Sequence, residues 1–154
     1  MESASLLYRE ATSADVPDMV QARASDLEAG PADARMARYL EGEHHPQKAL
    51  APRIAFVALK GGSMVGYIGG HLTRRYDCDG ELQYLYVVPE ERRAGVASEL
   101  LRLLARWFAE HDASQVCVGV DEDNAGARSF CAHHGAMDLE LAFLAWSKIQ
   151  DVLA

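Results

Sequence analysis

The part of the chain best suited to chemistry is a strand that runs into a basic turn and then into a helix. It extends from Tyr86 to Leu101, with Arg92, Arg93 and Gly95 in the turn. A helix start leaves backbone N–H groups without partners and carries the positive end of the helix dipole, so it holds anions. Gly95 leaves room beside the main chain, and the arginines add charge. The spacings of the Walker loop and the dinucleotide fingerprint are absent, so we predict a phosphate cradle of another kind.

Two motifs give this cradle a family context. Val88-Pro89 followed by Arg92-Arg93-Ala94-Gly95-Val96-Ala97 resembles the Q/R-x-x-G-x-G/A motif of the GNAT superfamily, the acyl-CoA-dependent N-acyltransferases. Asn124-Ala125-Gly126-Ala127-Arg128-Ser129-Phe130, followed by Gly135, is similar to the N-x-x-A-x-x-F/L-Y-x-x-x-G segment of the same superfamily. Two motifs in the family's order are more specific than one. The resemblance is clear from about Arg53 to Gly135, and the whole chain has the length of one such domain.

The resemblance implies how acetyl-CoA is held as the acyl donor. Backbone amides from Arg93 to Ser98 would bind the diphosphate, the main chain of Tyr86 to Val88 would pair with pantetheine, and Asn124 would lie near the thioester. The expected cofactor-binding residues are Tyr86, Val87, Val88, Arg92, Arg93, Ala94, Gly95, Val96, Ala97, Ser98 and Asn124. The alternatives are an ordinary strand-to-helix turn and an Asn124 that only caps a helix.

Acyl transfer to an amine also needs a proton acceptor. Glu81 stands eleven residues before Arg92, the spacing at which several GNAT enzymes carry a glutamate base. The resemblance therefore implies that Glu81 is the base, acting directly or through water. The alternative is a solvated carboxylate at a strand edge beside Asp77 and Asp79.

The proton donor for the departing thiolate is where the chain departs from the family. Cys131 occupies the position of the usual tyrosine. A thiol with an ordinary pKa of about 8.5 can do the same work, whereas a small residue that buries readily also suits the core. The substitutes are Tyr84, Tyr86, Ser129, His133 and water.

The predicted function is an N-acyltransferase that moves an acetyl group from acetyl-CoA to an amine by direct attack in a ternary complex. Cys131 motivates one alternative, a non-catalytic acyl-CoA-binding or regulatory domain. A hydrolase with Cys131 as nucleophile and His133 or His134 as base is disfavoured, because residues two or three apart on a helix face each other poorly. No residue pattern in the sequence identifies the acceptor amine.

The elements that must position these residues follow from hydrophobic periodicity and turn signals. Strands are expected at 6–10, 53–60, 64–72, 81–88, 115–120 and 141–146, with a hairpin turn at 61–62 and a bulge at 69–70. Helices are expected from the capping residues 12–15 to about 28, at 32–43, from 96 to about 108, and from the cap at 123–124 to 135. This order predicts an α/β fold, a mixed and mostly antiparallel sheet with helices on both faces.

Composition fits one domain over residues 1–154, since 154 residues with 49% hydrophobic content can bury a sizeable core. No apolar run approaches the ~20 residues that span a bilayer, and the N-terminus lacks the features of a signal peptide, so we expect no membrane partner and a cytoplasmic location. Three cysteines without a C-x-x-C pair indicate reduced thiols.

Charge and histidine spacing limit the partners further. A net charge of −8 argues against nucleic acid, because binding a phosphate backbone relies on many basic contacts. The six histidines include two adjacent pairs and no metal-ligand spacing, so we expect surface or loop positions and no metal. The resemblance also allows a homodimer.

Overall fold

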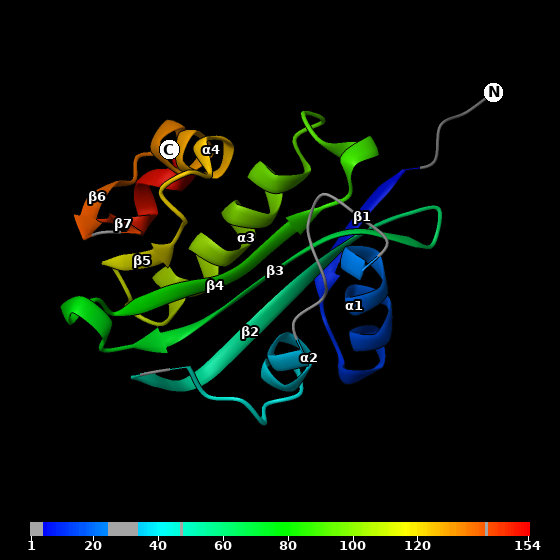
Figure 1. Ribbon diagram of the computed structural model, residues 1–154, viewed down its shortest axis with the longest axis horizontal. Helices are drawn as coiled ribbons and strands as arrows, with labels where there is room; N and C mark the ends of the chain where they lie inside the picture. Colours follow the sequence, from blue (N-terminus) through cyan, green and yellow to red (C-terminus); the bar gives the residue numbers. More distant parts are fainter. Residues whose placement is uncertain (1–4, 25–33, 47, 141) are drawn as a thin grey trace.

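A twisted sheet with helices on both faces forms the molecule (Figure 1) in a computed structural model that describes residues 5–24, 34–46, 48–140 and 142–154. The strands are β1 Leu6–Glu10, β2 Ala49–Lys60, β3 Ser63–Thr73, β4 Gly80–Val87, β5 Val116–Gly119, β6 Met137–Glu140 and β7 Phe143–Trp146. The helices are α1 Val16–Ala24, α2 Ala34–Leu40, α3 Val96–Glu110 and α4 Ala125–His133. Short 3₁₀ turns are η1 Ser13–Asp15, η3 Arg75–Asp77, η4 Pro89–Glu91 and η5 Ile149–Leu153.

The sheet order among the described residues is β1-β2-β3-β4-β5-β7-β6. Neighbouring strands pair antiparallel except β4 and β5, which are parallel and are joined by the crossover helix α3. The predicted mixed, mostly antiparallel sheet is therefore confirmed.

The structure differs from the predicted elements in two strands and one short turn. The sheet has a further strand, β6, because the four residues after the α4 turn pair with β7 although all four are exposed and lack a core-facing pattern. The strand predicted to start at Arg53 begins at Ala49, since a register shift between Leu50 and Arg53 lets pairing continue past Pro52. The η5 turn was not predicted. The predicted helix ends at Glu28 and Ala32 lie outside the described residues.

Helix α3 packs on one face of the sheet, against β2, β3 and β4 (Figure 1). Its apolar residues recur at helical spacing, so one stripe is buried. The buried members are Val96, Leu100, Leu101, Leu104, Ala105 and Phe108. The Phe108 ring lies against Gly80 so closely that a Cβ there would collide with it. This contact fixes α3 over the start of β4.

Helices α1 and α2 cover the other face (Figure 1). A smaller core cluster lies there, formed by Met19, Val57, Tyr67 and Tyr86. Burying side chains of this size contributes about 1.5–3 kcal/mol each relative to leaving them exposed. The two helices are thus held against β2, β3 and β4, on the side of the sheet opposite α3.

An ion pair fixes the start of this helical layer. Asp15 is buried and accepts two hydrogen bonds of 2.8 Å from the Arg9 guanidinium, and it also accepts one from the Thr12 backbone N–H at 2.7 Å. The hydrogen bonds from Arg9 lower the pKa of Asp15 from 3.8 to about 2. A carboxyl whose folded pKa is depressed adds stability above its unfolded pKa, and this stability is lost as the pH falls through the folded value.

Replacing Asp15 by Asn should therefore lower the free energy of unfolding at pH 7 by about 1 kcal/mol, because the Arg9 side chain that pairs with it is 40% exposed and water screens the interaction. Urea unfolding at pH 7 and at stepwise lower pH measures the difference from the wild type, which should shrink between about pH 4 and pH 2. Asp18→Asn is the matched control, because Asp18 is an exposed carboxylate in the first turn of α1. Equal losses in the two variants would contradict this account.

Candidate functional site

A bulge in β4 decides which way its side chains point. Gly69 pairs with Tyr84 and Gly70 with Leu82, so Gln83 is an extra residue on β4. The register shift falls at the predicted Gly69-Gly70 position, although the extra residue belongs to the partner strand. Because side chains alternate along a strand, one extra residue puts Glu81 and Tyr84 on the same face, the one that α1 and α2 cover.

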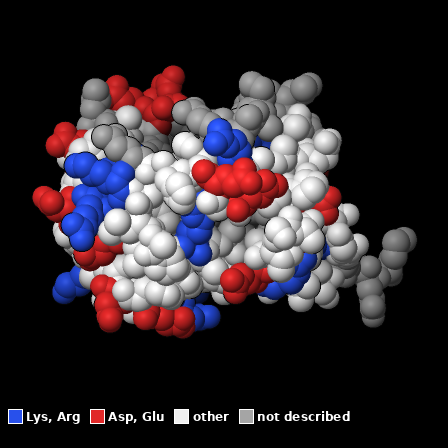
Figure 2. All heavy atoms as spheres, turned by 90° about the horizontal axis from the view of Figure 1, so that it is seen from below, with Lys and Arg blue, Asp and Glu red and all other residues white. Residues whose placement is uncertain are grey.

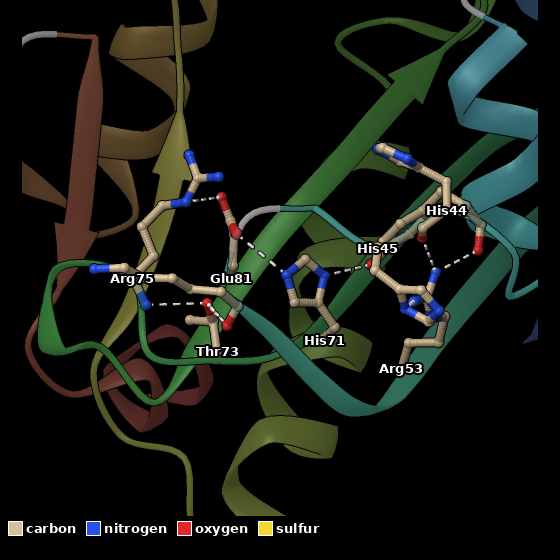
Figure 3. A network of polar contacts seen from close by, with 9 residues as sticks. His44, His45, Arg53, His71, Thr73, Arg75 and Glu81 are labelled. Carbon is tan, nitrogen blue, oxygen red and sulfur yellow. Dashed lines mark hydrogen bonds and ion pairs between the residues drawn. The ribbon is translucent and has the colours of Figure 1, made fainter.

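Glu81 is buried in this face and has two partners (Figure 3). Its side chain is 4% exposed. Oε1 lies 3.1 Å from His71 Nε2, and Oε2 lies 3.7 Å from Arg75 Nε, which belongs to the η3 turn. The alternative of a solvated strand-edge carboxylate is therefore wrong.

His71 links Glu81 to α2. It is fully buried in β3 opposite Glu81, and the Tyr39 hydroxyl lies 2.7 Å from its Nδ1. The expectation of surface or loop histidines is thus wrong for His71. No spacing motif pointed to this pair, because it depends on the β3–β4 register, which the η3 turn sets. The usable signal was a lone histidine inside an otherwise apolar strand.

Arg53 on β2 holds the end of α2 in place. Its Nη1 donates to the backbone oxygens of Tyr39 at 2.7 Å and His44 at 2.9 Å, and its guanidinium lies 4.5 Å from the centre of the Tyr39 ring. Its Nη2 lies 2.7 Å from His45 Nδ1. These contacts (Figure 3) restrict the position from which Tyr39 reaches His71.

The predicted phosphate cradle lies at the other end of β4, between η4 and α3. Arg93 and Gly95 have positive φ angles, 68° and 87°, and this geometry turns the chain into the start of α3 at Val96. Residues Arg93 to Gly95 are exposed, and a Cβ built on Gly95 would meet no atom within 4 Å. Open space therefore lies beside Gly95 at the start of a 15-residue helix, whose first backbone N–H groups have no partner within the helix.

Arg92 is fixed to the strand that precedes the cradle. Its Nε donates to the backbone oxygen of Val87 at 3.0 Å, and its guanidinium lies 5.8 Å from the centre of the Tyr86 ring. This contact places a positive charge where β4 ends and the cradle begins.

Strands β4 and β5 pair over a short distance only. Gly80 to Leu82 pair with Val116 to Val118, whereas β4 continues to Val87. Beyond Leu82, the edge of β4 on this side has no strand partner among the described residues. Backbone groups on such an edge are available to an extended ligand.

Two further predicted residues have structural contacts. Asn124 Oδ1 accepts a hydrogen bond from Ala127 N at 3.2 Å, so Asn124 caps α4. The Ser98 hydroxyl lies 3.1 Å from His134 Nε2, which ties the first turn of α3 to the end of α4. Burial, followed by the nearby charges of His133 and Arg102, lowers the pKa of His134.

Cys131 lies in the main core on α4 and is 4% exposed. Burial raises the pKa of its thiol to about 11. A thiol with a raised pKa stays protonated and is a poor nucleophile, which disfavours the hydrolase alternative. It is also a weaker acid than an ordinary thiol, so its environment favours the core role over proton donation.

We therefore expect Cys131→Ala to keep the wild-type turnover while its melting temperature falls, with a stability loss of about 1 kcal/mol. Steady-state kinetics and thermal unfolding measure the two effects. Cys131→Ser is the control, since it keeps a proton donor of similar size. If alanine abolished turnover and serine restored it, residue 131 would be the proton donor.

Neither surface charge nor clusters of metal-binding side chains point to a further ligand in the part of the chain that the structure describes. On the face drawn in Figure 2, the coloured basic and acidic groups are interspersed, so no continuous patch of one sign selects a partner there. The described residues include no group of three His, Cys, Asp or Glu side chains suited to a metal ion. None of their helices is long and apolar enough to cross a membrane.

Comparison with known proteins identifies the family. The family model "Acetyltransferase (GNAT) family" matches residues 18–136. An uncharacterized N-acetyltransferase of Mycobacterium tuberculosis is 33% identical over 112 residues, which cover 73% of this chain and 65% of that protein. The counterpart in Mycobacterium bovis matches equally well. The chain belongs to the GNAT acetyltransferase family, and it spans 65% of the length of these relatives.

Solved structures share the fold. Ard1 from Thermoplasma volcanium is 20% identical with a TM-score of 0.71, and the match covers 91% of this chain and 94% of that one. The PaiA N-acetyltransferase from Thermoplasma acidophilum in complex with coenzyme A is 14% identical with a TM-score of 0.67, over 92% of this chain and 96% of that one. The family and the fold predicted from the sequence are thereby confirmed.

Proposed function

We propose that this chain is an acyl-CoA-dependent N-acyltransferase that transfers an acetyl group from acetyl-CoA to an amine in a ternary complex. Family membership and the fold support this function. So do the open cradle after Arg92, the unpaired edge of β4 and a buried carboxylate on the face opposite α3. The resemblance in sequence and the relative with bound coenzyme A support the choice of acyl donor.

The residues present suit the parts of acetyl-CoA. The backbone amides from Arg93 to Ser98 would hold the diphosphate, with Arg92 and Arg93 as charged partners. The β4 edge from Tyr86 to Val88 would bind pantetheine, and Asn124 would lie near the thioester. When bound, acetyl-CoA supplies the acyl group as an activated thioester. Glu81 would accept the proton that the amine loses, directly or through water.

The open backbone at Gly95 carries this proposal. A positive φ at Arg93 and Gly95 with empty space above gives an anion access to the amides at the start of α3. Calorimetry with coenzyme A tests the cradle, and release of free thiol from acetyl-CoA across a panel of amines tests the reaction. A folded protein that binds no coenzyme A would refute the assignment.

A non-catalytic acyl-CoA-binding domain is the second candidate. It is favoured by Cys131, which stands at the tyrosine position of the family motif and is buried. Coenzyme A binding without turnover on any amine of the panel would support it. Turnover on a single amine would exclude it.

A further inference from the structure

The direction of the hydrogen bonds around Glu81 can be assigned from the buried groups. Tyr39 is 1% exposed, and its hydroxyl has one hydrogen-bond partner among the described residues, His71 Nδ1. A buried hydroxyl that failed to donate would cost about 1–3 kcal/mol. Burial also raises the pKa of Tyr39, so its proton stays on the oxygen. The hydroxyl therefore donates, and Nδ1 accepts.

This direction fixes the protonation of the ring. If Nδ1 is an acceptor, the neutral imidazole carries its proton on Nε2. That nitrogen lies 3.1 Å from Glu81 Oε1, so it donates to the carboxylate. Both ring nitrogens are then occupied by hydrogen bonds within the protein, and the ring is fully buried. His71 therefore has no atom with which to contact the acceptor amine.

We propose that His71, held by the Tyr39 hydroxyl, is a positioning residue for acyl transfer that occupies Glu81 Oε1 and leaves Oε2 as the proton-accepting oxygen. This inference rests on the proposed function. In the reaction, the amine nitrogen bonds to the acyl carbon as the C–S bond breaks and the thiolate leaves. The N–H bond breaks, its proton binds Glu81 Oε2, and His71 keeps its own proton throughout.

Charged and polar groups from several elements surround His71 and Glu81. They are Tyr39 on α2, Arg53 on β2, Arg75 on η3, Cys78 just before β4, Tyr84 on β4 and Cys117 on β5. The Arg75 guanidinium lies on the Oε2 side of the carboxylate, with its Nε at 3.7 Å.

Turnover of three variants tests the proposal. His71→Leu removes the donor to Glu81, and because a hydrogen bond to a charged group contributes about 1.5–3 kcal/mol, kcat should fall about tenfold to a hundredfold. The KM for acetyl-CoA should stay unchanged, because the cradle that would hold the acyl donor lies at the other end of β4. His71→Gln keeps an N–H donor and should lose less. His111→Gln is the control at an exposed histidine after α3.

A structural role alone predicts a different result. In that case, the Leu and Gln variants would have lower melting temperatures, but kcat per folded molecule would be unchanged in both, and this outcome would overturn the proposal. Equal losses of kcat in the Leu and Gln variants would overturn it as well, because only Gln keeps a donor to Glu81.

A second measurement does not depend on turnover. Nitrogen-15 spectra of the histidine rings, with His71 assigned by its absence from His71→Gln, should show a ring protonated on Nε2 only. A proton on Nδ1 would overturn the inference even if the protein transfers acyl groups. If the spectra agree but no amine is acylated, the proposed function fails and the hydrogen-bond assignment stands.

Discussion

Replacing Glu81 by Gln is expected to lower kcat by about 10²- to 10⁴-fold, the range that a positioned general base contributes. Glutamine has the same shape, and its amide oxygen still accepts the hydrogen bond from His71, so the fold should persist. It accepts no proton from the amine, so the loss should appear in the chemical step. Steady-state kinetics, beside calorimetry with coenzyme A, would measure turnover and binding separately.

The dissociation constant for coenzyme A should be the same in Glu81→Gln as in the wild type, because the carboxylate lies on the face opposite α3. Glu110→Gln is the matched control, since it removes one charge from an exposed position at the end of α3. Turnover of Glu81→Gln at the level of this control would remove Glu81 from the mechanism.

Replacing Gly95 by Val should weaken coenzyme A binding by about tenfold to a hundredfold, as expected when one charge-assisted hydrogen bond is lost. The empty space at Gly95 is where we place the diphosphate, and a branched side chain would fill it. Valine at a φ of 87° also costs about 1–3 kcal/mol of stability. Calorimetry with coenzyme A and urea unfolding separate the two effects.

Gly42→Val controls for backbone strain. Gly42 has a φ of 85° and no atom within 4 Å of a built Cβ, but it follows α2 on the face opposite α3. Both variants should lose similar stability, and only Gly95→Val should lose affinity. Equal affinities would show that the diphosphate is not held at Gly95.

Much of the fold was predictable because its signals are local. The apolar stripe of α3, the Gly61-Gly62 hairpin and the glycine that precedes α3 each depend on neighbours in sequence. Strand β6 was missed because its residues are exposed on both faces, and a hydrophobic pattern cannot reveal a strand that buries no side chain. Its pairing with β7 comes from backbone hydrogen bonds.

The candidate site was only partly predictable. Family spacing pointed to Glu81 and the cradle residues, whose roles remain predictions. Glu81 contacts His71, and His71 contacts Tyr39; these residues come from distant parts of the chain and meet through strand register and helix packing. Burial of Cys131 was one of two readings from the sequence, and the packing of α4 on the core favours it.

The extra residue in β4 gives this strand one position that regular pairing with β3 does not need. Deleting Gln83 would leave Glu81 and Tyr84 two residues apart, the spacing at which regular alternation keeps both side chains on the same side of the sheet. Inserting a second residue beside Gln83 would instead have to widen the bulge or shift one end of the strand by one position, which would turn its side chains to the opposite face. Evolutionary drift in this segment should therefore tolerate the loss of Gln83 far better than the gain of a residue beside it.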